Sequence, residues 1–209
     1  MAEKDTPIRM YMDDPTIVWR KGKPDYSKAD QLYLQGRTKF HALDSVEKTV
    51  SDFVKTFEME VRHKLRLEDF HTITPDFKMN VNGGRYFDVQ EILARGSYNV
   101  FLSNTPLYDA DKETNASSDQ LFSGAFTEGF GWEVLEVING PPKLVFTWRH
   151  WTRMTGPFRD HQPTGERLEL FGSAVANMTT DNRLSCVNLF FDPSTMLTKL
   201  QGHCPILNN

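Results

Sequence analysis

The chain has 209 residues, of which 39% are hydrophobic and 25% are charged, so length and composition fit one soluble globular domain with a sizeable core. Its formal net charge of −4 at pH 7 gives no general attraction to nucleic acid or to anionic lipid, and neither is expected as a partner. No apolar run reaches the length of a membrane-spanning helix, so no membrane span is expected.

The cysteines and histidines give no sign of a metal or disulfide site. Cys186 and Cys204 form neither a disulfide framework nor a ligand spacing, so free thiols in a reducing compartment are expected. The histidines lack His-x-x-x-His spacing, and no phosphate loop or dinucleotide fingerprint is present, so neither a metal nor a cofactor is expected. The charged N-terminus carries no secretory signal, which predicts a cytoplasmic location.

Residues 1–40 are predicted to form an N-terminal extension packed on a body that comprises residues 41–209. Turn residues recur at 12–15 and 21–24, and a short helix is predicted within 27–38. We expect Trp19 and Tyr26 to dock this extension on the body.

A long amphipathic helix is predicted over residues 44–67, with Asp44 or Ser45 as its cap. Its apolar side chains, Phe57 among them, recur at three- and four-residue spacing. His63 lies toward the C-terminal end, where it either gains from the helix dipole or reaches a pocket.

The next segment contains one strand, a second helix and a polar loop. Phe77, Met79 and Val81 alternate with polar residues after Pro75, which predicts the strand. Asp88 opens a helix over 89–102, in which Tyr98 points its hydroxyl either into a cavity or into water. Residues 105–120 are polar and acidic without a calcium-loop pattern, and are predicted to form a loop.

From residue 132 the period changes to two, and strands are predicted over 132–138, 144–153, 167–177 and 184–192, followed by a helix over 194–201. Helices followed by such a meander indicate an α+β fold, with a curved antiparallel sheet wrapped around the long helix as a cone-shaped barrel. Phe146, Trp148 and His150 are predicted to share the core face of the second strand, and Arg149 and Trp151 its outer face.

Two ionisable groups on these strands are candidates for acid–base chemistry. Burial raises the pKa of a carboxyl group, so Asp192 is the first candidate for proton exchange near neutral pH, and His150 is the second. Each residue has a structural alternative that remains open. For Asp192 the alternative is a cap of the helix that follows it, and for His150 it is a hydrogen-bonded core histidine.

The chain resembles two related families. The segments Thr155-Gly-Pro-Phe and Pro163-Thr-Gly, with Asp192 after the last hairpin, resemble SnoaL-like polyketide cyclases, which have the nuclear transport factor two-like fold. The resemblance implies that Asp192 is the acid–base group of an intramolecular ring closure. A longer resemblance, to the pathogen-related protein family, rests on Trp19-Arg20, Gly96-Ser-Tyr-Asn, Gly131-Trp-Glu-Val, Arg149-His-Trp, Gly156-Pro-Phe and Asp192-Pro193.

These observations predict a cofactor-independent cyclase or isomerase that acts on an apolar polyketide or terpenoid intermediate of secondary metabolism. Its substrate would be held by Trp148, Phe146, Phe190, Asn188, Tyr98, Phe57 and His63. One alternative is a non-catalytic, defence-associated protein that binds a small apolar molecule in the same cavity. Another is a homodimer or interaction module that uses the outer sheet face with Arg149 and Trp151.

Overall fold

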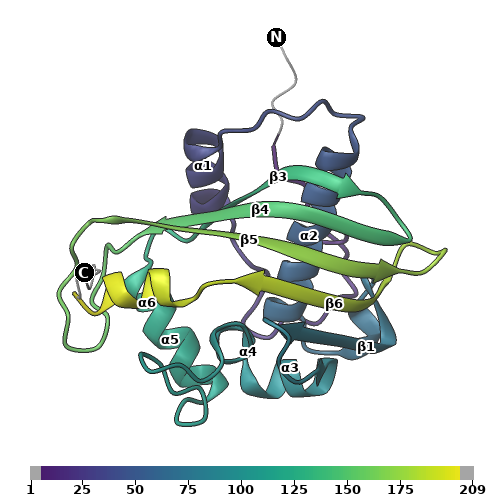
Figure 1. The fold of residues 1–209 in the computed structure, drawn as a ribbon. Coiled ribbons are helices and arrows are strands. Elements are labelled where there is room, and N and C mark those ends of the chain that lie inside the picture. The colour runs from purple at the N-terminus through teal and green to yellow at the C-terminus, as the bar shows by residue number, and fades with distance from the viewer. Residues whose placement is uncertain (1–5, 203–209) are drawn as a thin grey trace.

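In the computed structural model, which describes residues 6–202, one six-stranded sheet curls around a long helix (Figure 1). The strand order is β2-β1-β6-β5-β4-β3. The strands are β1 (Ile73–Val81), β2 (Phe87–Asp88), β3 (Gly131–Asn139), β4 (Lys143–Arg153), β5 (Arg167–Met178) and β6 (Leu184–Phe191). The helices are α1 (Ser27–Gly36), α2 (Val46–His63), η1 (Leu67–Asp69), α3 (Val89–Arg95), α4 (Ser97–Leu102), α5 (Asn115–Ala125) and α6 (Ser194–Leu200). The predicted α+β architecture is confirmed.

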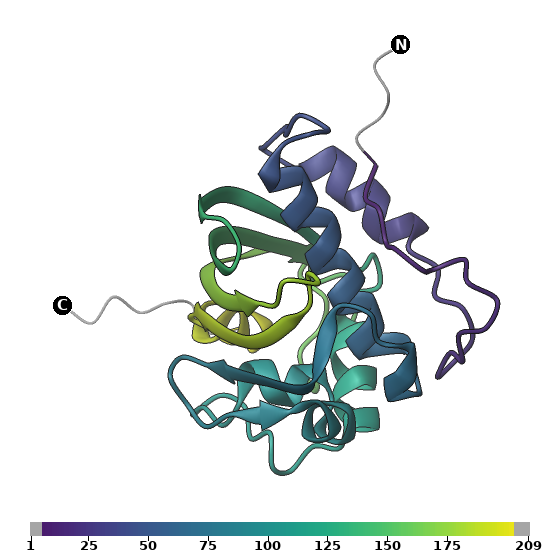
Figure 2. The same ribbon diagram turned by 90° about the vertical axis from the view of Figure 1, so that its right-hand side faces the viewer.

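The central helix α2 lies against the concave side of the sheet, with the N-terminal segment on its other side (Figure 2). Ser45 caps it as predicted, accepting the backbone N–H of Lys48 at 3.1 Å. The helix is shorter than predicted because Lys64 leaves it in an extended conformation and pairs with Trp19 in an antiparallel bridge. The N-terminal segment is thereby joined to the end of α2.

Between β2 and β3, the predicted extents of two elements were wrong. The helix over 89–102 is two helices, because Gly96 has a φ of 88° that ends α3 and begins α4. The predicted loop over 105–120 contains the start of α5, where Thr114 and Ser117 form a reciprocal capping box. The helix was missed because the segment is polar. One of the positions it buries is occupied by Ser118, and the apolar Phe122, also buried, lies beyond residue 120.

The sheet is antiparallel as predicted except at one junction, where β1 and β6 run parallel. Met79 lies opposite Val187 and Val81 opposite Leu189 in that pair. The register shifts between Ile73 and Lys78, the stretch that contains Pro75, so the strand continues through the proline. The parallel pair places the first long strand beside the last one.

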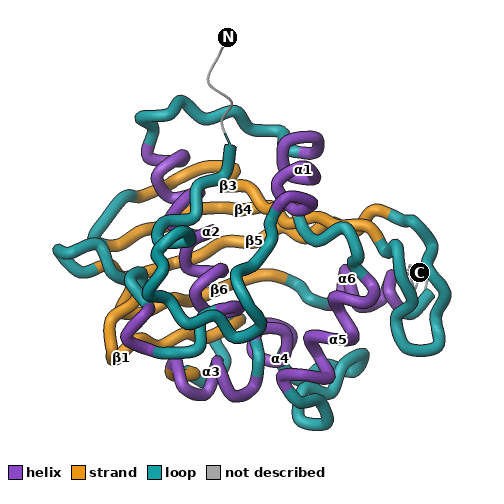
Figure 3. The backbone as a smooth tube through the Cα atoms, turned by 180° about the vertical axis from the view of Figure 1, so that it is seen from behind, coloured by secondary structure: helices purple, strands orange, loops and turns teal. Residues whose placement is uncertain are grey.

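The N-terminal segment covers α2 and one face of the sheet. Its loops cross the outer side of α2 (Figure 3), where the Met10 backbone N–H donates to Thr56 at 3.0 Å and Arg20 to the His63 carbonyl at 2.8 Å. At the sheet, Tyr33 stacks on Trp151 with ring centroids 6.4 Å apart. No helix within residues 6–202 is long and apolar enough to cross a membrane.

Arg149 and Trp151 lie on the face opposite Trp148 and His150, as predicted, but the expectation that this face is open was wrong, because both side chains are buried, at 4% and 2% exposure. The Arg149 guanidinium pairs with Glu133 at 2.5 Å and donates to the Gly36 carbonyl at 3.2 Å. Glu133 in turn accepts the backbone N–H groups of residues 38 and 39. Residues 33–39 therefore cover the face that was proposed as a dimer interface.

Candidate functional site

The predicted site centres on the concave face of the sheet. The register of β4 with β5 sets His150 opposite Leu170, Trp148 opposite Gly172 and Phe146 opposite Ala174. Trp148 and Phe146 are buried and belong to the core cluster that also includes residues of α2. The glycine makes room for the indole, since a Cβ at Gly172 would lie 2.3 Å from the Trp148 Cζ2 atom. The space beside the small residues of β5 is therefore filled by β4 side chains.

His150 keeps accessible surface although it lies on this interior face. Its ring packs on Phe130 with centroids 4.8 Å apart, and neither ring nitrogen has a hydrogen-bond partner among residues 6–202. Burial, and then the charge of Arg62, lower the pKa of His150 to about 4. The imidazole is therefore neutral at neutral pH and has an uncommitted nitrogen lone pair. This differs from the hydrogen-bonded core histidine that was the alternative.

Arg62 and Tyr98 form the polar part of the same region. Arg62 lies in the last turn of α2, its Cζ atom 5.7 Å from the Tyr98 ring centroid and its Nη2 atom 3.2 Å from the Asp119 Oδ1 atom. Tyr98 comes from α4 and stacks on Phe122 with centroids 4.4 Å apart. Its hydroxyl is buried, so the alternative with the hydroxyl in water was wrong, and burial raises the pKa of Tyr98.

Asp192 follows β6 and is exposed. One carboxylate oxygen accepts the Ser194 backbone N–H at 2.9 Å and the Ser194 hydroxyl at 2.5 Å, and the other accepts the Thr195 hydroxyl at 3.3 Å. The Ser194 hydroxyl is the largest cause of a pKa lowered below the usual range, so the expected rise was wrong. These contacts tie Asp192 to the first turn of α6, next to its cap residue Pro193, in keeping with the structural alternative, and Asp192 is not among the groups that shift the pKa of His150.

Two predicted pocket residues lie on the other face of the sheet. β6 pairs with β5 so that Phe191 lies opposite Gly172 and Phe190 opposite Ser173. Phe190 and Asn188 therefore share the convex face, where Phe190 is 41% exposed and Asn188 accepts the Tyr86 hydroxyl at 2.9 Å. The prediction assigned the even positions of this strand inward, and the pairing with β5 reverses that assignment.

The two predicted residues of α2 divide between core and surface. Phe57 is buried and packs on Phe77 with ring centroids 5.6 Å apart. His63 is half-buried and meets the Tyr26 ring edge-on at 5.7 Å. Burial, and then the charge of Arg62, lower the pKa of His63 to about 4, so it is neutral at pH 7 and cannot gain as a cation from the helix dipole.

Four residues that surround His150 or its neighbours were not predicted from the sequence. Trp132 of β3 lies directly opposite His150, and Phe191 packs on Trp148 with ring centroids 5.6 Å apart. Pairing the strands across the turn at 139–142 would have found Trp132. Phe130 precedes the strand, and Arg62 gave no signal, because a charged residue near a helix end is usually solvated.

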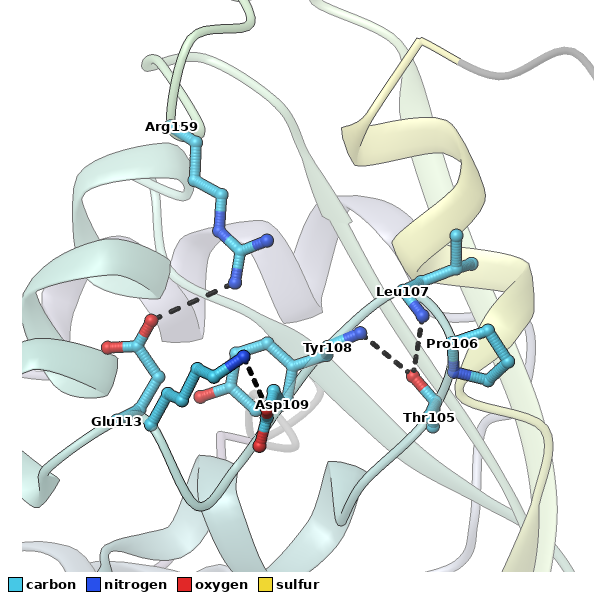
Figure 4. Close-up of a pocket in the computed structure, with 8 residues that line it drawn as sticks. Thr105, Pro106, Leu107, Tyr108, Asp109, Glu113 and Arg159 are labelled. Carbon is cyan, nitrogen blue, oxygen red and sulfur yellow. Dashed lines mark hydrogen bonds and ion pairs between the residues drawn. The ribbon is translucent and has the colours of Figure 1, made fainter.

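The surface carries a separate hollow of about 510 Å³, lined by residues of the α4–α5 loop and by Arg159 (Figure 4). Its lining residues are Thr105, Pro106, Leu107, Tyr108, Asp109, Lys112, Glu113 and Arg159. A smaller hollow, of about 280 Å³, lies between β2 and the end of α4. Residues 6–202 contain no group of three histidine, cysteine, aspartate or glutamate side chains that could hold a metal ion.

The chain is similar to a pathogen-related protein of Hordeum vulgare, with 36% identity over 189 residues that cover 86% of this chain and 80% of that protein. No protein-family model matches it. Among solved structures, it is similar to a putative polyketide cyclase from Streptomyces antibioticus, IdmH, with 16% identity, a TM-score of 0.47, and coverage of 72% of this chain and 97% of that one. It is also similar to a putative polyketide cyclase from Acidithiobacillus ferrooxidans, with 15% identity, a TM-score of 0.45, and coverage of 78% and 100%.

Proposed function

This chain belongs to the pathogen-related protein family, and we propose that it is a cofactor-independent cyclase or isomerase that acts on a small apolar molecule carrying a carbonyl group. A polyketide or terpenoid intermediate of secondary metabolism has this chemistry. His150 is its proposed base, with Arg62 and Tyr98 as the groups that stabilise developing negative charge.

One observation carries the proposal: a neutral imidazole with an uncommitted nitrogen faces the apolar, concave side of the sheet. Four aromatic or aliphatic side chains of that face keep accessible surface, which supports room for a ligand beside His150. They are Phe130, Trp132, Leu189 and Phe191. Because the lowered pKa keeps His150 unprotonated at neutral pH, the ring is available to accept a proton.

The proposed reaction starts with a ligand whose ring system lies against the aromatic wall. His150 takes a proton from the carbon next to the carbonyl group, and negative charge moves onto the carbonyl oxygen. Arg62 stays charged at any physiological pH and acts electrostatically on His150, so its charge favours an anionic oxygen at this place. The buried Tyr98 hydroxyl is a neutral donor for the same oxygen. Return of the proton from His150 to another carbon gives isomerisation. Attack of the carbanion on a second carbonyl forms a carbon–carbon bond and an alkoxide, which takes the proton back from His150 and completes ring closure.

Proton exchange at carbon tests the base directly. With 1-tetralone as the probe in D2O at pH 7, the protein should accelerate exchange of the protons next to the carbonyl, measured by NMR. His150→Gln should lower the rate by about 10²–10⁴-fold, the usual contribution of a general base. Asp192→Asn is the matched carboxylate control and should keep the exchange rate.

The two variants separate the candidate bases. Exchange that survives His150→Gln and disappears with Asp192→Asn contradicts the role of His150 and restores that of Asp192. Circular dichroism of both variants shows that a lost rate is not lost folding.

A second candidate function is non-catalytic binding of a small apolar molecule, in keeping with the defence-associated alternative. The observation that favours it concerns the missing carboxylate partner. Asp192 accepts hydrogen bonds from Ser194 and Thr195, and His150 has no carboxylate partner among residues 6–202. A container would quench tryptophan fluorescence on addition of 1-tetralone, through Trp132 and Trp148, and would show no exchange.

A further inference from the structure

The hollow beside Arg159 is built from two turns that hydrogen bonds hold in place. In the α4–α5 loop, Thr105 and Tyr108 exchange backbone hydrogen bonds at 2.8 and 3.3 Å, and the Leu107 carbonyl accepts from the side chain of Gln201, the residue after α6, at 2.6 Å. The facing turn closes with two backbone bonds between Phe158 and His161, each 3.0 Å. A site whose walls are already ordered loses little conformational entropy when it binds a ligand.

Arg159 projects from this second turn without a strong partner. Its backbone lies in the left-handed region, at a φ of 52°, which is unusual for a residue other than glycine. The guanidinium lies over the rings of Phe158 and Tyr108, with its Cζ atom 5.6 and 5.8 Å from their centroids. Arg159 donates no hydrogen bond to any residue within 6–202, so its N–H groups remain available.

Glu113 faces Arg159 across a gap, as Figure 4 shows. The nearest atoms, Glu113 Oε1 and Arg159 Nη2, are 3.8 Å apart, which is an ion pair too long for a hydrogen bond. The other Glu113 oxygen accepts the Ser117 hydroxyl at 2.5 Å, which fixes the carboxylate. An opposite pair of charges held at this distance leaves the Arg159 N–H groups and Glu113 Oε1 without a hydrogen bond to each other.

The rest of the lining adds an apolar edge and no net charge. Pro106 and Leu107 form that edge, and Tyr108 shows only its ring, because its hydroxyl donates to Asn99 at 2.5 Å. Lys112 and Asp109 pair with each other at 3.1 Å. Together with Arg159 and Glu113 they are the four charged lining residues, and their formal charges sum to zero. A ligand with a single charge would meet one repelling group together with the attracting one.

We propose that this hollow is a second binding site, for a zwitterion of the α-amino acid type with an apolar side chain. The carboxylate binds the Arg159 guanidinium, and the ammonium binds Glu113 Oε1, so the two groups of the ligand complete the loose ion pair. The side chain lies against Leu107 and Pro106. The hollow of about 510 Å³ has space for an amino acid of any size.

The test is isothermal titration of the full chain with L-phenylalanine and two matched probes. These are 3-phenylpropanoate, which lacks the ammonium, and 2-phenylethylamine, which lacks the carboxylate. We expect one site for L-phenylalanine and at least tenfold weaker binding of each single-charge probe, because each loses one charge-assisted hydrogen-bond set. Equal affinity for either single-charge probe, or no heat with L-phenylalanine at millimolar concentration, would overturn the proposal.

Variants locate the site and separate it from the concave face. Arg159→Gln and Glu113→Gln should each weaken L-phenylalanine at least tenfold, while Arg183→Gln, a similarly exposed arginine paired with Asp181, should not change it. Arg159 is at an exposed turn, so its variant is the one least able to disturb folding. His150→Gln should bind L-phenylalanine as the unaltered chain does. Affinity that survives Arg159→Gln places the amino acid elsewhere and refutes the assignment.

Discussion

Glu133 ties the N-terminal segment to the sheet, and Glu133→Gln should lower the free energy of unfolding by about 2–4 kcal/mol. The carboxylate, 1% exposed, accepts the backbone N–H groups of Thr38 at 2.8 Å and Lys39 at 3.0 Å, the Thr38 hydroxyl at 3.0 Å, and Arg149 at 2.5 Å. Glutamine keeps one acceptor oxygen and turns the other into a donor, so some of these donors lose their acceptor. Removing one partner of a buried ion pair costs about 3–5 kcal/mol. The loss is smaller here because Arg149 keeps Glu169 at 2.7 Å.

Urea unfolding at pH 7, followed by tryptophan fluorescence and by far-ultraviolet circular dichroism, measures this change. Glu136→Gln is the matched control, because it makes the same substitution in the same strand at an exposed position. That control should stay within about 0.5 kcal/mol of the unaltered chain. A loss below about 1 kcal/mol for Glu133→Gln would refute the reasoning, since it would mean that the buried contacts are replaced at little cost.

Three further changes follow from burial and close packing. Burial lowers the pKa of Lys55 to about 7, so between pH 7 and the unfolded value of about 10.4 only the unfolded chain holds the extra proton. The stability of the unaltered chain relative to Lys55→Met should therefore rise between pH 7 and about 9.5 in urea titrations, and a flat difference contradicts the lowered pKa. For His150 the window is acidic. The unfolded chain binds its proton below about pH 6.5 and the folded chain only near 4, so stability is lost as pH falls through that range and His150→Gln should lose less. Gly156→Ala should cost about 1–3 kcal/mol, because its Cβ would lie 1.9 Å from the Gly124 carbonyl oxygen, whereas Gly124→Ala meets nothing within 4 Å and should stabilise its helix in thermal melts.

Local periodicity predicted the elements of this fold well where one face of an element is apolar. The long helix and the four C-terminal strands were found because their side chains repeat at 3.6 or 2 residues. The start of α5 was missed because Ser118 and its neighbours are polar, and the break at Gly96 because a backbone torsion leaves no periodic signal. The parallel placement of β1 depends on pairing between distant segments, which no local pattern contains.

The candidate site was predicted less well, for reasons that concern faces and partners. Phe146, Trp148 and His150 were assigned to the correct face because the whole strand alternates. Phe190 was assigned to the wrong face, because only the register of β6 against β5 decides which set of positions points inward. The chemistry of Asp192 depends on two hydroxyl groups that reach back to it from the next helix. Such contacts are common at helix starts, so the capping alternative was visible in the sequence and the pKa was not.

The pairing of β1 with β6 determines when the sheet can be completed during folding. Thr74 in β1 donates to the Leu184 carbonyl, a contact between residues 110 positions apart. Until β6 is available, β1 has only the two-residue β2 beside it, and a short two-stranded ribbon is marginally stable in water. Closing so long a segment of chain costs entropy before the contact is gained, so the chain should fold slowly for its size. It should also keep the edge of β1 exposed to chaperones until synthesis has passed the last strand.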